Sequence, residues 1–344
     1  MKTKTKIYVT GGSNCIIARG WVFQLSKLPI ADVHTLAVGA SSSLMGAFRT
    51  IFSGNMTPGS TLIWEYALND ALFLDEDDFD PTLLLRWVEY TILHCKAQNI
   101  RMIGLILTPG NREKVVEMDA YRIALLQLFA HHSVETIELS TLYRAELDVP
   151  VLPPEVYKGN NHFHSDGVVY PFIVEKVVAQ IERTPPTFGH ANPIYVRGLD
   201  DLSCVLSFED ATVAPFTNNL LSIDTWEPVG HTMTTAPMTQ DVSVLGVACL
   251  IALHGGAMEL RAKDWSVTMS MARKPQVRTI PLLQMMDIAQ NCGPLIVKKD
   301  EILSLNWLSK DQCPPLTLGS FFDPDDLGFQ TRAGRVCGIL LETL

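Results

Sequence analysis

The sequence lacks the features that mark a disulfide framework, a zinc site or a membrane span. Its seven cysteines are odd in number and dispersed, and no two form a C-x-x-C pair, which argues against a disulfide scaffold and a cysteine-based zinc site. No apolar run reaches the roughly 18 residues that a spanning helix needs. The basic start, MKTKTK, is not followed by an apolar stretch of signal length. We expect a reducing, cytoplasmic setting, although a chain trimmed of a leader would read the same.

Positive charge is also scarce. The chain has 27 Lys and Arg against 37 Asp and Glu, a formal net charge of -10. Nucleic acids and anionic membranes are bound through clustered positive charge, so we expect a small or neutral partner instead. There is no internal repeat or low-complexity tract. The 344 residues and the hydrophobic content of 47% predict a globular protein of about two domains; its oligomeric state is not predicted.

Over residues 6–183, short apolar runs of strand length alternate with longer amphipathic runs. The strands are expected at Ile7–Thr10, Thr35–Val38, Thr61–Tyr66, Arg101–Leu107 and Val134–Leu139, and the helices at Asn14–Leu25, Thr82–Gln98, Arg112–Ala130 and Val168–Glu182. Such alternation predicts an α/β fold, a doubly wound parallel sheet covered by helices on both faces. Ligands bind at the carboxyl ends of the strands of such sheets.

The stretch RTPPTFGHANP breaks this alternation with three prolines and a glycine. We therefore predict an α/β domain over residues 1–183, a Pro-rich linker over 184–193 and a β-rich domain over 194–344. Beyond the linker, strand-like runs and closely spaced turns are typical of a β-sandwich or jelly roll. One helical interruption is expected at Leu282–Gln290.

The first strand ends in a glycine-rich turn, IYVTGGSN, and a helical pattern follows at once. A serine on such a strand-to-helix turn has its hydroxyl exposed at the sheet edge, beside free helical N–H groups that favour negative charge. This position suits a nucleophile, but Ser13 could equally be the N-cap of the helix. A dinucleotide site is disfavoured, because Cys15 and Ile17 stand where that fingerprint needs glycines.

Polar or small residues follow the ends of four successive elements of this domain. They are Gly11-Gly12-Ser13-Asn14 after the first strand, Gly39 after the second, Asn69-Asp70 after the third, and the segment Asn161-His162-Phe163-His164-Ser165-Asp166-Gly167 before the last helix. All four should meet at one edge of the sheet. Taken singly, each has a structural explanation: Asn69-Asp70 would be a turn, for example.

In order, spacing and placement these residues resemble the SGNH (GDSL-like) hydrolase family, and the resemblance covers roughly residues 6–183. It implies a flavodoxin-like α/β/α fold in which Ser13 is the nucleophile and His164 its base. It also implies an oxyanion hole formed by Gly39 and Asn69. His162 competes for the role of base, but only His164 has the family's offset to residue 161 and to the last helix.

The sequence departs from the family pattern at three positions. Gly12 replaces an aspartate and Ala67 a glycine, and neither of these supplies chemistry. Asn161 stands where an aspartate would orient the histidine and stabilise its charged form, and an amide replaces that carboxylate only in part. Asn161 is thus the candidate third member of the catalytic group, unless a backbone carbonyl or Asp166 orients His164.

The resemblance implies a serine esterase or O-acyltransferase, with an acyl ester or acylated carbohydrate as its substrate. The carbohydrate preference comes from the family and from the appended β domain, not from any spacing. No metal or cofactor is expected. The alternative is a weakened or inactive binding or assembly module, which Asn161 would explain. Elsewhere, His131-His132 ends a helix and is expected on the surface.

Overall fold

The computed structural model describes residues 4–76, 79–159, 162–163, 167–185, 191–218, 221–253, 255–273, 281–314, 318 and 334–344. The chain divides into two compact units, Met1–Leu199 and Asp200–Leu344. Within the described ranges, no helix combines the length and apolarity needed to cross a membrane.

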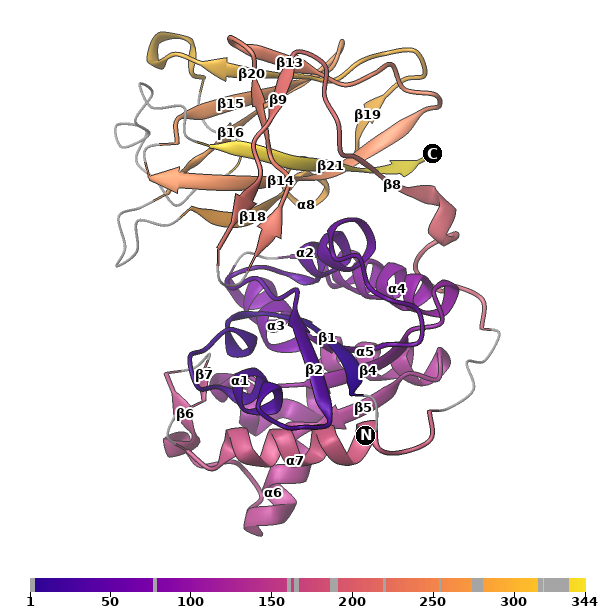
Figure 1. Cartoon of the computed structure of the whole chain (residues 1–344), viewed down its shortest axis with the longest axis vertical. Coiled ribbons are helices and arrows are strands. Elements are labelled where there is room, and N and C mark those ends of the chain that lie inside the picture. The colour runs from indigo at the N-terminus through magenta and orange to yellow at the C-terminus, as the bar shows by residue number, and fades with distance from the viewer. Residues whose placement is uncertain are drawn as a thin grey trace. The chain divides into compact units, whose positions relative to one another are not determined.

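The first unit is built on a five-stranded parallel sheet (Figure 1). Its strands are β1 (Thr5–Gly11), β2 (Ala31–Thr35), β3 (Thr61–Glu65), β4 (Arg101–Ile106) and β5 (Glu135–Glu138). Their order is β2-β1-β3-β4-β5, and every neighbouring pair is parallel. This is the flavodoxin-like order, whose switch point lies between β1 and β3. The predicted fold class is confirmed.

Helices cover both faces of this sheet. They are α1 (Trp21–Ser26), α2 (Ser43–Phe48), α3 (Ala67–Glu76), α4 (Pro81–Ala97), α5 (Ala120–His131), α6 (Leu139–Leu147) and α7 (Val169–Ile181), with a π-helical turn η2 (Arg49–Ser53) after α2 and 3-10 segments η1 (Ser13–Cys15), η3 (Gly110–Met118) and η4 (Pro154–Val156). A hairpin of β6 (Tyr157–Lys158) and β7 (His162–Phe163) precedes α7.

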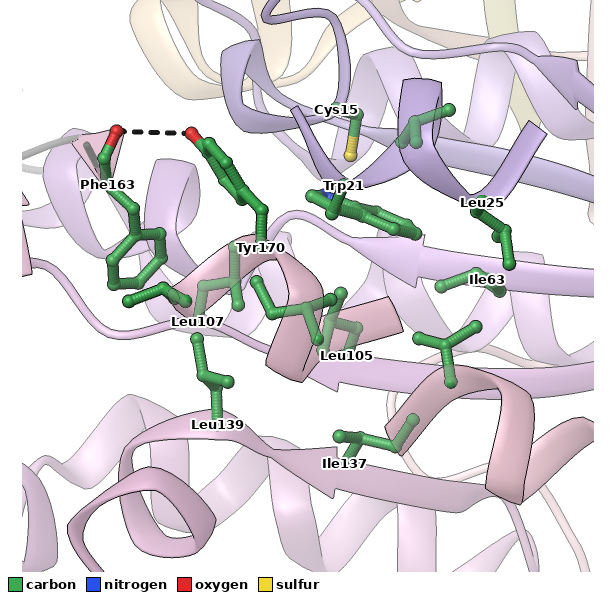
Figure 2. Packing of buried hydrophobic residues seen from close by; sticks show 14 of the residues in the cluster. Cys15, Trp21, Leu25, Ile63, Leu105, Leu107, Ile137, Leu139, Phe163 and Tyr170 are labelled. Atoms are coloured by element: carbon green, nitrogen blue, oxygen red, sulfur yellow. Dashed lines mark hydrogen bonds between the residues drawn. The ribbon is translucent and has the colours of Figure 1, made fainter. Parts of the chain in front are cut away.

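The core on one face of the sheet joins α1 and α7 to the strands. Figure 2 shows Trp21 of α1 and Tyr170 of α7 in one apolar cluster with Ile63, Leu105 and Ile137 of the strands. On the opposite face, Trp64 of β3 meets Phe129 of α5 edge-on at 5.5 Å between ring centroids. Successive side chains of a β-strand point to opposite faces of the sheet, so Ile63 and Trp64 lie on different faces. The sheet is therefore buried on both sides, as its near-continuous apolar strands predict.

Two predicted long helices are each interrupted. The predicted helix Asn14–Leu25 consists of η1 and then α1, since Arg19 adopts a left-handed φ of 63° and α1 starts only after Gly20. The predicted helix Arg112–Ala130 consists of η3 and α5, because the Asp119 side chain accepts from the Arg122 N–H at 3.0 Å and starts a new helix there.

The second strand lies earlier than predicted. Strand β2 ends at Thr35, where the predicted strand Thr35–Val38 begins. The chain nevertheless stays beside β1, because the N–H groups of Leu36 and Val38 donate to the carbonyls of Val9 and Gly11 at 2.7 and 3.0 Å. The helices α2, α3 and α6 were not predicted from the sequence.

The second unit is β-rich, as predicted. Its strands are β8 (Leu202–Val205), β9 (Ala211–Val213), β10 (Phe216–Thr217), β11 (Ser222–Ile223), β12 (Trp226–Pro228), β13 (Thr232–Thr234), β14 (Val242–Leu253), β15 (Ala257–Arg261), β16 (Ser266–Ser270), β17 (Ala272–Arg273), β18 (Leu282–Asp287), β19 (Leu295–Val297), β20 (Ser304–Leu308) and β21 (Arg335–Thr343). An eight-stranded sheet is organised around β14 and β21, and a four-stranded sheet has the order β13-β20-β15-β16. Almost all the pairings are antiparallel, and one apolar cluster contains residues of both sheets.

The helical interruption predicted at Leu282–Gln290 is mostly wrong. Residues Leu282–Asp287 form β18, which pairs antiparallel with β14, and only the short helix α8 (Ile288–Cys292) follows. Leu283 and Met286 are buried there, so tertiary pairing with β14 outweighs local helical preference. Asp287 caps α8 by accepting from the Gln290 N–H at 3.0 Å.

Residues beyond the predicted linker still belong to the first unit. The Glu89 carboxylate of α4, fully buried, accepts the N–H groups of Ile194, Tyr195 and Val196 at 2.8, 2.6 and 3.0 Å. It also contacts Nε2 of His132 at 2.7 Å. His132 is therefore a buried partner of Glu89 and not a surface residue, because a buried carboxylate needs hydrogen-bond donors.

Candidate active site

The turn after β1 brings the Ser13 hydroxyl to a histidine. Ser13 opens η1, whose N-cap is Gly12 and makes no side-chain capping bond. The Ser13 Oγ instead lies 2.7 Å from Nε2 of His162. The helix-cap interpretation of Ser13 is therefore wrong, and its hydroxyl is engaged with an imidazole across 149 positions of the chain.

His162 is delivered by the hairpin ahead of α7. It pairs with Lys158 across the β6–β7 ladder, while its neighbour Phe163 is buried against the ring of Tyr157 at 5.1 Å between centroids. The Tyr170 hydroxyl donates to the Phe163 carbonyl at 3.2 Å (Figure 2). Anchoring Phe163 in the core directs the preceding side chain to the opposite face. Burial and, secondarily, the positive charge of Lys158 lower the pKa of His162.

Asn69 lies in the first turn of α3, directly after β3. Its side chain is 5% exposed and rests against the turn: a Cβ on Gly12 would come 1.9 Å from Asn69 Oδ1. Within the described ranges, that oxygen has no hydrogen-bond partner. The absence of a side chain at residue 12 is what lets this amide approach Ser13, and the Asn69-Asp70 pair is helical and not a turn.

Gly39 reaches the same place from the chain after β2. A Cβ on Gly39 would lie 3.6 Å from Ser13 Cβ and 3.2 Å from the Ile16 side chain. The hydrogen bonds that the N–H groups of Leu36 and Val38 donate to β1 position Gly39 beside Ser13. Ser13, Gly39 and Asn69 thus converge at the carboxyl end of β1, as the sequence predicts.

Two acids are buried where β3 ends and α3 begins. Glu65, the last residue of β3, accepts through Oε2 from the Gly12 N–H at 3.3 Å and from the Cys15 thiol at 3.1 Å. Asp70 accepts from the Ser43 N–H at 2.8 Å and from the Tyr121 hydroxyl at 2.6 Å. Burial raises the pKa of Glu65 to about 8 and that of Asp70 to about 7.

Three residues named from the sequence, Asn161, His164 and Asp166, lie outside the described residues. The contact made by His162 was not the one expected from family spacing. A signal for it was present: Phe163 is a large apolar residue, so alternation in an extended segment predicts that the adjacent His162 faces away from the core. The same pattern applies to position 164, so alternation alone could not choose between the two histidines.

The arrangement suits acyl transfer. A hydroxyl in hydrogen-bond contact with an imidazole is the pairing that activates a serine nucleophile. The Asn69 amide and the main-chain N–H groups of the turn are the types of donor that bind an oxyanion. Within the described residues, no group of three or more His, Cys, Asp or Glu side chains is placed to hold a metal ion.

Comparison with known proteins shows likeness in fold. No family model matches the chain, and no curated protein is significantly similar to it in sequence. Among solved structures, a two-domain esterase (CEX) active on acetylated mannans superposes with a TM-score of 0.58 at 10% identity, covering 99% of this chain and 92% of the other. The same esterase co-crystallised with mannopentaose gives 0.61 at 11% identity over the same shares. The likeness shows that this chain shares the fold of that protein over most of its length.

Proposed function

We propose that this chain is a serine-dependent carboxylic-ester hydrolase that removes O-acetyl groups from a carbohydrate. The observation that carries the proposal is the 2.7 Å contact between Ser13 Oγ and His162 Nε2 at the switch point of the sheet. His162 takes the role of base in this proposal in place of His164, because it is the described histidine that reaches the nucleophile.

The reaction proceeds in two half-reactions. Ser13 Oγ attacks the acyl carbonyl carbon while His162 Nε2 accepts the hydroxyl proton. The tetrahedral intermediate then loses the sugar oxygen, which takes that proton and leaves as an alcohol. Water attacks the acyl-enzyme and gives a proton to His162. The intermediate then expels Ser13 Oγ, which takes that proton back from His162, and acetic acid is released. If a second hydroxyl replaces water, the same site performs acyl transfer.

Negative charge on the intermediate is met by three donors in this proposal. They are the Asn69 side-chain amide and the main-chain N–H groups of Ser13 and Gly39. One such donor is typically worth about 10²–10³ in rate. The close approach of the Asn69 side chain to Gly12 supports this role, because it places the amide beside the turn that carries Ser13.

The environment of His162 suits a base that works near neutral pH. Its lowered pKa keeps the imidazole neutral and able to accept a proton. Lowering the pKa also weakens the base, and Lys158 is the named charge that contributes to this. The substrate class rests on two supports: the resemblance to SGNH hydrolases, and a fold shared over 99% of this chain with an esterase active on acetylated mannans.

The test compares four proteins on a chromogenic acetyl ester and on acetylated mannan, with labelling by a serine-directed phosphonate. Ser13→Ala should lose turnover and labelling, and His162→Ala should lose on the order of 10⁴ or more in kcat. His164→Ala is the matched control and should stay near wild type. Loss in His164→Ala with full activity in His162→Ala would reverse the assignment of the base.

A non-catalytic carbohydrate-binding or assembly module is the second candidate. One feature favours it: the position three residues before His162 is Gly159, with φ of 70°, where the motif of the SGNH family has an aspartate that orients the base. Loss of that aspartate weakens the base in a serine hydrolase. Absence of both turnover and labelling in the wild-type protein, with retained binding of mannan oligosaccharides, would support this candidate.

A further inference from the structure

We propose that Glu65 is a positioning residue, a neutral buried acid that holds the nucleophile turn in its reactive geometry. This inference rests on the proposed function. In this proposal Glu65 does not touch the substrate. It acts on Ser13 through Gly12 and Cys15, which flank Ser13 in the chain.

The first support is where the Glu65 carboxyl group bonds. Its Oε2 accepts from the N–H of Gly12, one residue before Ser13, and from the thiol of Cys15, two residues after it. The backbone carbonyl of Glu65 accepts from the same Gly12 N–H at 3.3 Å. One side chain therefore spans the turn, and its displacement would move both the Ser13 hydroxyl and the main-chain N–H proposed to bind the oxyanion.

The second support is the glycine at residue 11. A Cβ there would lie 2.9 Å from Glu65 Oε2, 2.8 Å from the Glu65 carbonyl and 2.5 Å from Cys15 Sγ. The carboxyl group and the thiol thus occupy the space that a side chain on Gly11 would need. The two adjacent glycines leave space for different side chains. The space beside Gly11 is occupied by Glu65, and the space beside Gly12 is occupied by Asn69.

The third support is the other carboxyl oxygen. Glu65 is fully buried, and its Oε1 has no hydrogen-bond partner within the described ranges. An ionised carboxylate with one uncompensated buried oxygen is costly, whereas a neutral acid carrying its proton there is much less so. The titratable groups that face it are Cys15 from η1, Asp70 from α3 and Tyr170 from α7; none of them is a cation.

Glu89 of the same unit provides the contrast. Its side chain is also closed to solvent, but both its oxygens are bonded: Oε1 by His132 and Ile194, Oε2 by Tyr195 and Val196. Burial opposes its ionisation, yet these donors outweigh burial and lower its pKa. Glu89 is a structural carboxylate, while Glu65, with weaker donors and a free oxygen, has its pKa raised to about 8.

The experiment measures kcat, KM and the rate of Ser13 labelling from pH 6 to 10 for wild type, Glu65→Gln, Glu65→Ala and the control Glu89→Gln. Glu65→Gln keeps a neutral acceptor, so it should retain wild-type kcat at pH 6 to 7. It should lack the decline in kcat that we expect of wild type through pH about 8, where ionisation of Glu65 would put an uncompensated charge next to the turn. Glu65→Ala should lose about 10²-fold in kcat with little change in KM, since a small displacement of a reacting group has that effect. Glu89→Gln should keep the wild-type pH profile.

A decline of Glu65→Gln at the same pH as wild type, or full kcat in Glu65→Ala, would overturn the proposal. Denaturant unfolding at each pH separates this result from failure of the ester chemistry. If wild type is inactive, the proposed function fails, but Glu65→Gln should still remove a loss of stability between pH about 4.5 and about 8. The same pH dependence in both proteins would refute a neutral Glu65.

Discussion

Acids with raised pKa values are buried in both units of this protein, but in different surroundings. In the first unit, Glu65 and Asp70 lie fully buried at one sheet edge, together with Asn69 and the turn that carries Ser13. In the second, Asp287 lies in a core of aliphatic and methionine side chains and caps the short helix α8. All three have raised pKa values. A perturbed acid therefore indicates function only where other reactive groups gather around it.

The largest effect expected from this comparison is on Asn69. Asn69→Ala should lower kcat by about 10²–10³ with little change in KM, because an oxyanion donor acts in the transition state. Asn306→Ala in β20 is the control from the second unit. Its side chain accepts from the Thr232 hydroxyl at 2.8 Å, so only stability should change. Steady-state kinetics and thermal unfolding distinguish the two. Equal kcat in the two variants would remove Asn69 from the site.

The next effect concerns stability against pH. Burial raises the pKa of both Asp70 and Asp287 from 3.8 to about 7. For an acid with a raised pKa the folded state holds the proton longer, so stability is fully present below pH 3.8 and is lost as pH rises through about 7. Asp70→Asn and Asp287→Asn should each remove part of this pH-dependent decrease in the free energy of unfolding, on the order of a few kcal/mol.

The two aspartate variants should differ in their effect on kcat. Asp70→Asn alters the contact to the Ser43 N–H beside the site and should also change kcat, whereas Asp287→Asn should leave it unchanged. Denaturant unfolding from pH 4 to 8 and kinetics at one pH provide both readouts. An unchanged slope of stability with pH in both variants would show that neither acid is kept neutral by the fold.

The smallest effect is expected at Lys158, which is exposed and lies across the ladder from His162. Removing its charge in Lys158→Ala should raise the pKa of His162 and move the acidic limb of kcat/KM to higher pH. Lys158→Arg is the control and should keep the wild-type limb. Because the charge is in solvent, high salt should shrink the shift. A shift toward lower pH would contradict the assignment of His162 as the base.

Much of the first unit was predictable from local pattern. The strands β1, β3, β4 and β5 and the helices α4 and α7 lie within a few residues of their predicted bounds, because periodicity and burial agree there. The failures have different causes, one local and one tertiary. Arg19 ends one helical pattern with a left-handed residue, and residues 282–287 pair with β14 despite a helix-like composition.

The candidate site was predictable in part for the same reason. Ser13, Gly39 and Asn69 follow the ends of parallel strands, so knowing that the sheet is parallel is enough to bring them to one edge. Glu65 was not singled out, because one acid at the end of an apolar strand has no periodic signal. The role proposed for Glu65 depends on its contacts with the turn after β1, where Gly11 and Gly12 leave space and the Cys15 thiol donates to the carboxyl group.

By itself, the sequence determined the alternation of strands and helices, the β-rich second unit and the meeting of Ser13, Gly39 and Asn69, because each follows from patterns a few residues long. Only the tertiary structure showed that the imidazole of His162 reaches the Ser13 hydroxyl, across 149 positions of the chain. That contact depends on the register of Lys158 with His162 and on the burial of Phe163, and register depends on packing that no local pattern encodes.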